Sequence, residues 1–210
     1  AVQKDGTCSI LALDQVQEIS LGIDEPIECL QILGKDPLRF LVGTEGPHIY
    51  EVTNNSVNPI ASFDQLEERS SWHTPWGGPP DVRSMSAGPD GAVYANVHVG
   101  GIPRSADGGA SWQQVLGRSA SPFSRATDVT FASNGTAYAV LSRNGGGFPE
   151  YGVYRSTDGG ATWSAANNGL DDLSTNDLQM DPIEPDTLYV AVSQSGETLD
   201  TLLAVQEVRR

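Results

Sequence analysis

The chain has 210 residues, 38% of them hydrophobic, with 23 glycines and 13 prolines. Such a length holds one domain with a sizeable core or two small ones, and the composition is typical of many short strands joined by tight turns. Acidic residues outnumber basic ones 27 to 12, which gives a net charge of −15. A chain this acidic repels phosphate backbones, so we expect no nucleic-acid partner. No run approaches the roughly 18 apolar residues of a membrane helix, so we also expect no membrane insertion.

Two cysteines, Cys8 and Cys29, leave three alternatives: one disulfide, two buried thiols, or half of a metal site. The pair lacks CxxC spacing, which makes metal binding the least supported of the three. A disulfide requires an oxidising compartment. The chain begins at Ala1 without an initiator methionine, as a processed secreted protein does and as a piece trimmed from a longer chain also does. We therefore expect a secreted, periplasmic or cell-surface location.

The predicted elements, taken in chain order, form repeated units. Residues 7–22 have the pattern of a strand that belongs to no unit. Four units of short antiparallel strands follow, each with an aromatic residue in its second strand. We place the units at about residues 26–63, 82–116, 126–166 and 173–210. Two of them show all four strands, and the last stops where its turn and fourth strand are due.

A decapeptide recurs between the third and fourth strands of the middle units. Arg104 to Gln113 reads RSADGGASWQ, and Arg155 to Ser164 reads RSTDGGATWS. Aspartate accepts hydrogen bonds from backbone N–H groups of its own turn, glycine supplies positive φ, and tryptophan brings apolar area to pack between sheets. The sequence thus predicts a structural turn built on Asp107, Gly109 and Trp112 and again on Asp158, Gly160 and Trp163. We expect these aspartates to be neither catalytic nor metal ligands.

The decapeptide closely resembles the Asp-box, or BNR repeat, of sialidase-type β-propellers, Ser-x-Asp-x-Gly-x-Thr-Trp, with Ser111 in place of threonine in the first copy. The resemblance implies an all-β fold: a single β-propeller domain over residues 1–210 with four-stranded antiparallel blades. Asp-box propellers include sialidases, xyloglucan-degrading hydrolases, sorting-receptor ectodomains and photosystem assembly factors, so the motif does not select an activity. The Arg-Ile-Pro motif of sialidases is absent from the sequence.

Several loops are expected at one end of this propeller, where a ligand would bind. Residues 64–81 contain closely spaced aromatic side chains, and residues 117–126 and 143–151 contribute charged ones. Exposed tryptophans beside carboxylates and arginines suit stacking on sugars, whereas buried ones would only plug a channel or cover a blade edge. The candidate ligand-binding residues are Trp72, His73, Trp76, Arg125, Arg143, Glu150 and Tyr151.

The function predicted from these residues is non-catalytic binding of a carbohydrate or a protein partner through the loop end, by a monomer or homodimer. The alternative is a glycoside hydrolase, sialidase-like or xyloglucanase-like, completed by a second subunit. We expect no catalytic residue, cofactor or metal, because no nucleophile-elbow pattern appears and His48, His73 and His98 lie apart in sequence.

Two further expectations concern the centre and the closure of the ring. Alignment of the first strands equates Cys29, Ser84, Asp128 and Asp177, which predicts a polar and partly acidic lining. Pairing of Thr7 to Gly22 with Leu202 to Val208 would close a ring of four blades. The alternative is two open half-rings that combine into a larger propeller of about eight blades.

Overall fold

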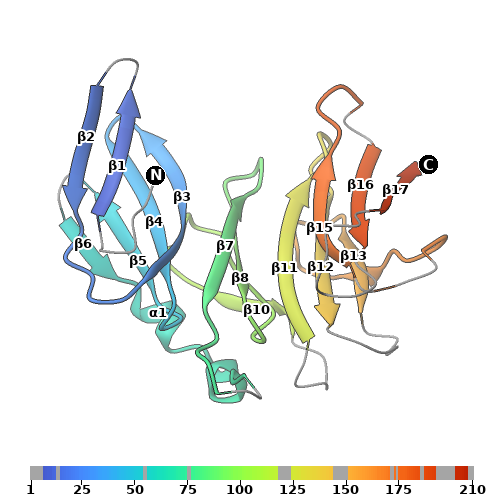
Figure 1. The fold of residues 1–210 in the computed structure, drawn as a ribbon, viewed down its shortest axis with the longest axis horizontal. Coiled ribbons are helices and arrows are strands. Elements are labelled where there is room, and N and C mark those ends of the chain that lie inside the picture. The colour runs from blue at the N-terminus through green and yellow to red at the C-terminus, as the bar shows by residue number, and fades with distance from the viewer. Residues whose placement is uncertain are drawn as a thin grey trace.

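The computed structural model describes residues 7–12, 15–53, 56–74, 77–117, 124–143, 151–170, 173, 175–184, 187–192 and 202–207. Within these ranges the fold is almost entirely β (Figure 1). The first sheet contains β3 (Ile27–Lys35), β4 (Leu38–Thr44), β5 (Ile49–Thr53) and β6 (Ser56–Pro59). The second contains β7 (Val82–Ala87), β8 (Val93–Val97), β9 (Ile102–Ser105) and β10 (Gln113–Leu116).

Two more sheets continue the same pattern. The third contains β11 (Ser124–Phe131), β12 (Ala137–Arg143), β13 (Gly152–Ser156) and β14 (Ser164–Ala165). The last contains β15 (Thr175–Met180), β16 (Thr187–Val192) and β17 (Leu202–Glu207). Every neighbouring pair is antiparallel, and strand order follows chain order in each sheet. The predicted all-β architecture of four-stranded antiparallel sheets is confirmed, with three strands described in the last sheet.

The segment before the first sheet differs from its prediction. It forms two strands, β1 (Thr7–Ala12) and β2 (Gln15–Ser20), which pair with each other as a hairpin. At the other end β17 pairs with β16, and β1 and β17 lie on opposite sides of the molecule (Figure 1). The expected closure of the ring by residues 7–22 against 202–208 is therefore wrong. Pairing across a two-residue connection orders far less chain than pairing across nearly the whole sequence, which favours the local hairpin.

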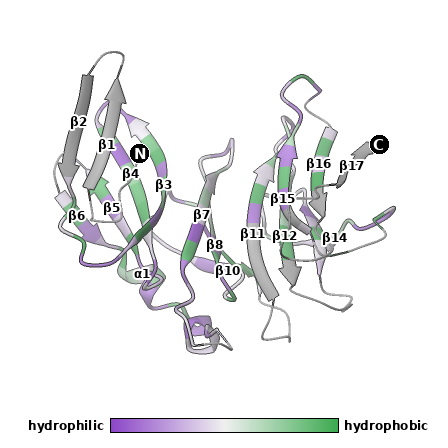
Figure 2. Cartoon of the chain, viewed as in Figure 1, coloured by the Kyte–Doolittle hydropathy of each residue, from purple (hydrophilic) through white to green (hydrophobic). Residues whose placement is uncertain are grey.

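The core lies between successive sheets. Strand β8 is buried along its whole length because it has a neighbouring sheet on both faces. The C-terminal five residues of β4 are buried between the second sheet and a cluster that contains Leu21 and Ile23. Hydrophobic residues follow these strands (Figure 2). Between the first two sheets the largest buried side chains are Leu41, Ile49, Phe63, Trp72, Val82, Met85 and Trp112. Between the second and third they include Tyr94, Ile102, Val129 and Leu141, and between the third and fourth Tyr138, Val140, Leu178 and Val190.

The connection from the first sheet to the second contributes to this core. It contains α1 (Ala61–Asp64) and a 3-10 helix, η1 (Glu67–Ser71). Phe63 from α1 is fully buried and meets the Trp112 ring edge-on, with the ring centroids 5.3 Å apart. The Ser62 hydroxyl donates to the carbonyl of Ala110, 2.8 Å away in the second sheet. The connection is thus packed against the next sheet.

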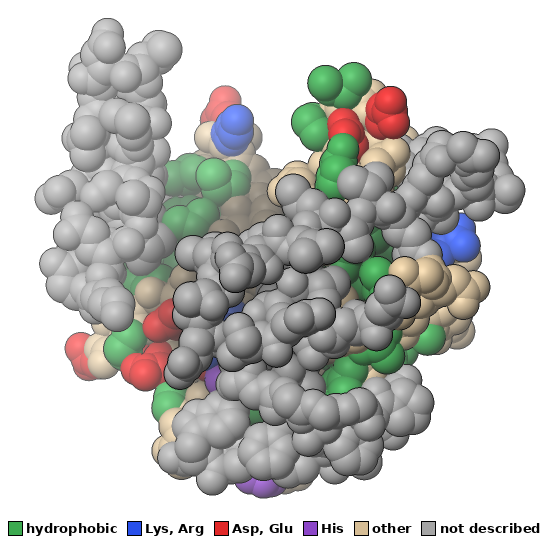
Figure 3. All heavy atoms as spheres, turned by 45° about the vertical axis from the view of Figure 1, so that its right-hand side comes forward, with side chains coloured by type: hydrophobic (Ala, Val, Ile, Leu, Met, Phe, Trp, Pro, Cys, Tyr) green, Lys and Arg blue, Asp and Glu red, His purple; other side chains and the backbone are tan. Residues whose placement is uncertain are grey.

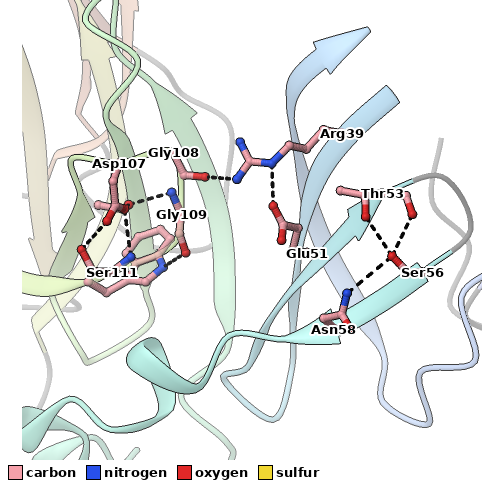
Figure 4. Close-up of polar contacts among 11 residues, drawn as sticks. Arg39, Glu51, Thr53, Ser56, Asn58, Asp107, Gly108, Gly109 and Ser111 are labelled. Atoms are coloured by element: carbon pink, nitrogen blue, oxygen red, sulfur yellow. Dashed lines mark hydrogen bonds and ion pairs between the residues drawn. The ribbon is translucent and has the colours of Figure 1, made fainter. Parts of the chain in front are cut away.

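The two Asp-Gly-Gly turns have identical hydrogen bonding. Asp107 Oδ1 accepts the hydroxyl of Ser105 and the N–H of Ser111, and its Oδ2 accepts the Ser111 hydroxyl at 2.6 Å (Figure 4). Ser105 Oγ accepts the N–H of Gly109, whose carbonyl accepts the Trp112 indole N–H. The same contacts recur around Asp158, through Ser156, Gly160, Thr162 and Trp163. In each turn the carboxylate accepts hydrogen bonds from its own turn.

Each turn is also held by the preceding sheet. Arg39 donates from Nη2 to the carbonyl of Gly108 at 2.7 Å, and its Nε pairs with Glu51 at 2.5 Å (Figure 4). Tyr94 donates its hydroxyl to the carbonyl of Gly159, the equivalent residue one sheet later. The turns are therefore joints between sheets, and their positive-φ glycines allow the close approach.

Replacing Asp107 by asparagine should lower the melting temperature at pH 7, because the amide removes the acceptor of the Ser111 hydroxyl. Hydrogen bonds from Ser111 hold the pKa of Asp107 at about 2, below its ordinary 3.8. A depressed pKa stabilises the fold above the ordinary pKa, and this stabilisation disappears as the pH falls through about 2. Melting curves from pH 7 to 2 should show Asp107→Asn converging on the wild type only at the acid end. Asp36→Asn, at an exposed position in the β3–β4 turn, is the control; an equal loss there would contradict the prediction.

Gly43→Ala should lower the free energy of unfolding by about 1–3 kcal/mol, as overpacking does. A Cβ at this position would lie 2.7 Å from Val82 Cγ1 and 2.8 Å from Cys29 Sγ, so it would force β4 away from β7. Urea unfolding measures the loss. The control is Gly117→Ala, where a Cβ meets nothing within 4 Å. If both variants unfold alike, the close contact of these two sheets is wrong.

Candidate functional site

The first strands of the four sheets lie side by side as inner strands. Strand β3 contacts β7, β7 contacts β11, and β11 contacts β15. In each sheet the pairing between the first and second strands skips one residue of the first strand. The skipped residue comes directly before the position that the sequence alignment equates. The skipped residues are Glu28, Arg83, Thr127 and Asn176, and the residues that follow are Cys29, Ser84, Asp128 and Asp177. A bulge changes the direction of the side chains beside it. The four residues that follow the bulges therefore have the same backbone environment, and we call them the inner row.

Cys29, the first residue of the inner row, is a free thiol. Its Sγ donates to the carbonyl of Val82 at 3.2 Å, and burial raises the pKa of the thiol to about 12. It is therefore neutral at physiological pH and is not joined to Cys8. The disulfide alternative is wrong, because this thiol is directed at a backbone carbonyl of the neighbouring sheet.

Ser84, the second residue, pairs with a buried amide. The side-chain nitrogen of Asn96 donates to Ser84 Oγ from the facing position on β8. Asn96 is fully buried, and its Oδ1 has no hydrogen-bond partner among the described residues. A buried amide of this kind fixes the local geometry and leaves one acceptor unused.

Asp128 and Asp177 bring two carboxyl groups together. Asp128 Oδ2 accepts the N–H of Leu178 at 3.3 Å, and Asp177 Oδ1 accepts the same N–H at 3.0 Å. Burial, and then the charge of Asp177 and a side-chain hydrogen bond to it, raise the pKa of Asp128 to about 6. Two carboxyl groups in such contact cannot both ionise without cost, so Asp128 gives up its proton at a higher pH than an ordinary aspartate does.

A histidine and an arginine surround Asp81 where β7 begins. His98 Nδ1 lies 2.9 Å from Asp81 Oδ1, and Arg83 Nε donates to Asp81 Oδ2, also at 2.9 Å. The His98 side chain is only 5% exposed. Burial raises the pKa of Asp81, but the hydrogen bonds from His98 and Arg83 outweigh it and leave the pKa below its usual value. This carboxylate is ionised and fully engaged.

A second polar cluster lies at the same end of the first sheet. His48 Nδ1 is 2.8 Å from Asp64 Oδ1, and its Nε2 is 3.9 Å from Glu25 Oε1. Glu25 also accepts the hydroxyl of Thr44 at 2.7 Å, and Arg69 donates to the carbonyl of Pro47. These side chains join the strand entrance, the β4–β5 loop and the helical connection, so their role is to fix that end of the sheet.

Trp72, predicted to stack on a ligand, belongs to the core. It is 7% exposed and lies beside Phe63, with ring centroids 5.8 Å apart. The Arg69 guanidinium covers its ring at 5.3 Å. The alternative given by the sequence was a tryptophan that plugs the channel or covers a blade edge; Trp72 instead packs in the core between the first two sheets. The signal for it was the helical connection itself, which supplies Phe63 and Arg69.

The other predicted ligand-binding residues divide among different settings. His73 is exposed, with Nδ1 2.9 Å from the carbonyl of Ser71, and Tyr151 is 2% exposed. Arg125 pairs in register with Ser142 and Arg143 with Ser124, so the backbones of both arginines lie at one end of the β11–β12 pair. Trp76 and Glu150 lie outside the described residues.

Sequence reasoning missed the engaged carboxylates of Asp81, Asp64 and Glu25. Each lies 16 or more residues from its histidine partner, so no short motif marked these pairs, although Arg83 is only two residues from Asp81. Within the described ranges, no group of three or more His, Cys, Asp or Glu side chains is arranged to hold a metal ion. Nor does that part of the chain contain a helix long and apolar enough to cross a bilayer.

No family model matches the chain, and no curated protein does. Several solved structures are similar to the chain. A GH74 enzyme of Niastella koreensis aligns with a TM-score of 0.50 and 20% identity, over 80% of this chain and 26% of its own. The WD40 β-propeller domain of Doa1 aligns with a TM-score of 0.58 and 13% identity, over 98% of this chain and 63% of its own. A GH74 xyloglucanase from Xanthomonas campestris aligns with a TM-score of 0.51 and 14% identity, over 85% of this chain and 28% of its own.

These likenesses concern the fold. With the face-to-face sheets and the side-by-side inner strands, they show that the protein has a β-propeller fold. The sheets form an arc that the described strands do not close. The chain spans about a quarter of the length of the GH74 enzymes that it matches.

Asp177→Asn should raise the melting temperature at pH 8 in buffer with EDTA, because it removes the charge that repels the Asp128 carboxylate. A raised pKa favours the folded state at low pH, and this advantage is lost as the pH rises from the ordinary 3.8 through about 6. The gain should thus shrink below pH 6 and vanish near pH 4. Asp36→Asn serves as the control for the loss of one negative charge. A pH-independent gain would refute the carboxyl contact.

Proposed function

We propose that this protein is a non-catalytic binding propeller whose ligand is a protein with a basic surface. The observation that carries the proposal is the contact between Asp128 and Asp177, because it separates binding from hydrolysis. The two carboxyl groups both accept the N–H of Leu178, at 3.3 Å and 3.0 Å, and are close enough for a side-chain hydrogen bond to each other. Glycosidases instead hold their two carboxyl groups about 5–5.5 Å apart to retain configuration, or about 6.5–9.5 Å apart to invert it.

Asp81 and Asp64, two further carboxylates at the loop end, are unsuited to acid–base chemistry on a substrate. Asp81 is held by His98 and Arg83, and Asp64 by His48. A general acid or base must reach the proton that it transfers, and these oxygens are already committed to neighbouring side chains. The likeness to GH74 enzymes therefore supports the shared architecture without their chemistry.

Charge favours a basic protein over a neutral ligand. The net charge is −15, and acidic side chains occur at several separate places on one face (Figure 3). Such a field accelerates the association of positively charged partners and makes it sensitive to salt. Stacking on a sugar is less supported, because Trp72 is buried and the only large hydrophobic side chains exposed among the described residues are Ile32 and Ile183.

The proposal retains several expectations from the sequence. The ligand would contact the loop end near His73 and the paired backbones of Arg125 and Arg143, with Trp76 and Glu150 as further contacts. The hydrogen-bonded turns at Asp107 and Asp158 support kinship with Asp-box propellers. In this protein the box has a structural role. A location outside the cytoplasm is part of the same proposal.

Binding of defined probes to the immobilised protein tests the proposal. The probes are a short Lys/Arg-rich peptide, its Glu-rich counterpart, a xyloglucan oligosaccharide and a sialylated trisaccharide, at low and high salt. We expect only the basic peptide to bind, with affinity that falls about tenfold or more as salt rises from roughly 50 to 300 mM. No product should form from either glycan. Turnover that Asp128→Asn abolishes would identify a hydrolase, and glycan binding without turnover would contradict the protein ligand.

A further inference from the structure

Two exposed turns contain an asparagine followed by a glycine. Asn134 and Gly135 lie in the turn between β11 and β12, and Asn168 and Gly169 lie in the turn that follows β14. Both asparagines are exposed, and the two glycines have almost the same positive φ, 84° and 87° respectively. A glycine has no Cβ, so its backbone nitrogen is open to the side chain of the residue before it. The two turns therefore present the same pair of reacting groups, a carboxamide carbon and an unhindered amide nitrogen.

In the turn between β11 and β12 both groups are engaged in hydrogen bonds. Asn134 Oδ1 accepts the N–H of Thr136 at 2.9 Å. The N–H of Gly135 donates to the carbonyl of Ala132, also at 2.9 Å. The carboxamide can turn toward the glycine nitrogen only when both hydrogen bonds break, and each costs free energy to break. The folded state therefore protects Asn134.

In the turn after β14 the same two groups have no such bonds. This turn is closed by the N–H of Leu170, which donates to the carbonyl of Asn167 at 3.1 Å. Neither the Asn168 side chain nor the N–H of Gly169 makes a hydrogen bond within the part of the chain that the structure describes. The bond that closes the turn lies outside the reacting pair, so the folded state does not protect Asn168 in the same way.

We propose that Asn168 is a site of spontaneous deamidation in the folded protein. The backbone nitrogen of Gly169 attacks Cγ of Asn168 and forms a new C–N bond. The proton of that nitrogen and the side-chain amide group leave together as ammonia, which closes a succinimide ring. Water then adds to either imide carbonyl and opens the ring, to give aspartate or isoaspartate at position 168. This inference does not depend on the ligand proposed above.

The reaction changes a turn that supports the loop end. The neighbouring Asn167 accepts the N–H of Val153 with Oδ1 at 2.8 Å and donates from Nδ2 to the carbonyl of Tyr151 at 3.2 Å. Deamidation of Asn168 adds a negative charge beside this contact, to a chain whose net charge is already −15. Isoaspartate also lengthens the backbone by one methylene group inside the turn.

Peptide mapping by mass spectrometry tests the proposal. Cleavage after arginine places the two asparagines in different peptides, 126–143 and 156–209. The full chain is incubated at pH 8 and 37 °C, folded or in urea, and the conversion of each asparagine is followed over weeks. In the folded chain Asn168 should convert about tenfold or more faster than Asn134, because two hydrogen bonds must break only at Asn134. In urea the two rates should agree within about threefold, because unfolding removes those bonds.

Equal rates in the folded chain, or faster conversion of Asn134, would overturn the proposal. A difference that persists in urea would overturn it as well, because it would then come from the neighbouring residues in the sequence and not from the fold. Asn168→Gln is the control for the assignment, since attack on glutamine must close a larger and less favourable ring. Conversion of peptide 156–209 that continues unchanged in this variant would assign the reaction to another residue. Binding of a basic peptide tests only the proposed function, so the two results are independent.

Discussion

Each sheet buries one face against the next sheet along the chain, and the other features of the molecule depend on this packing. The second strands carry apolar side chains on both faces, as β4 and β8 do, so no sheet satisfies them alone. The packing requires glycine where backbones approach, as at Gly43. It also brings Arg39 and Tyr94 onto the carbonyls of the turns in the following sheets. Each turn is thus formed by residues close in sequence, but it also connects two neighbouring sheets.

The repeated bulge explains how one backbone carries different chemistry. All four inner strands skip one residue at the same register position, and the side chains that follow are a thiol, a hydroxyl and two carboxyls. A thiol at Cys29 fits between sheets by donating to Val82, whereas the carboxyls of Asp128 and Asp177 meet each other. The fold fixes the position, and the residue at that position decides the chemistry.

Electrostatics separates two kinds of carboxylate in this acidic chain. Asp81 at the loop end is paired with His98 and Arg83 and stabilises the end of its sheet. Among the described residues, the inner pair has backbone N–H groups but no ion pair to offset its charge. Burial and the charge of Asp177 therefore make the ionised form of Asp128 less favoured than that of an ordinary aspartate, although this form predominates above about pH 6.

The sequence by itself determined the sheets, the two structural turns and the alignment of the inner row. These follow from local patterns: alternation along a strand, and Asp-Gly-Gly chemistry within ten residues, as at Asp107. Only the tertiary structure decided that Trp72 is buried, that Cys29 is a free thiol, and that the first strand segment folds into a hairpin. It also brought Asp128 and Asp177 together across two sheets. Such outcomes depend on which surfaces meet, and short-range patterns do not encode contacts between residues 50 or more positions apart.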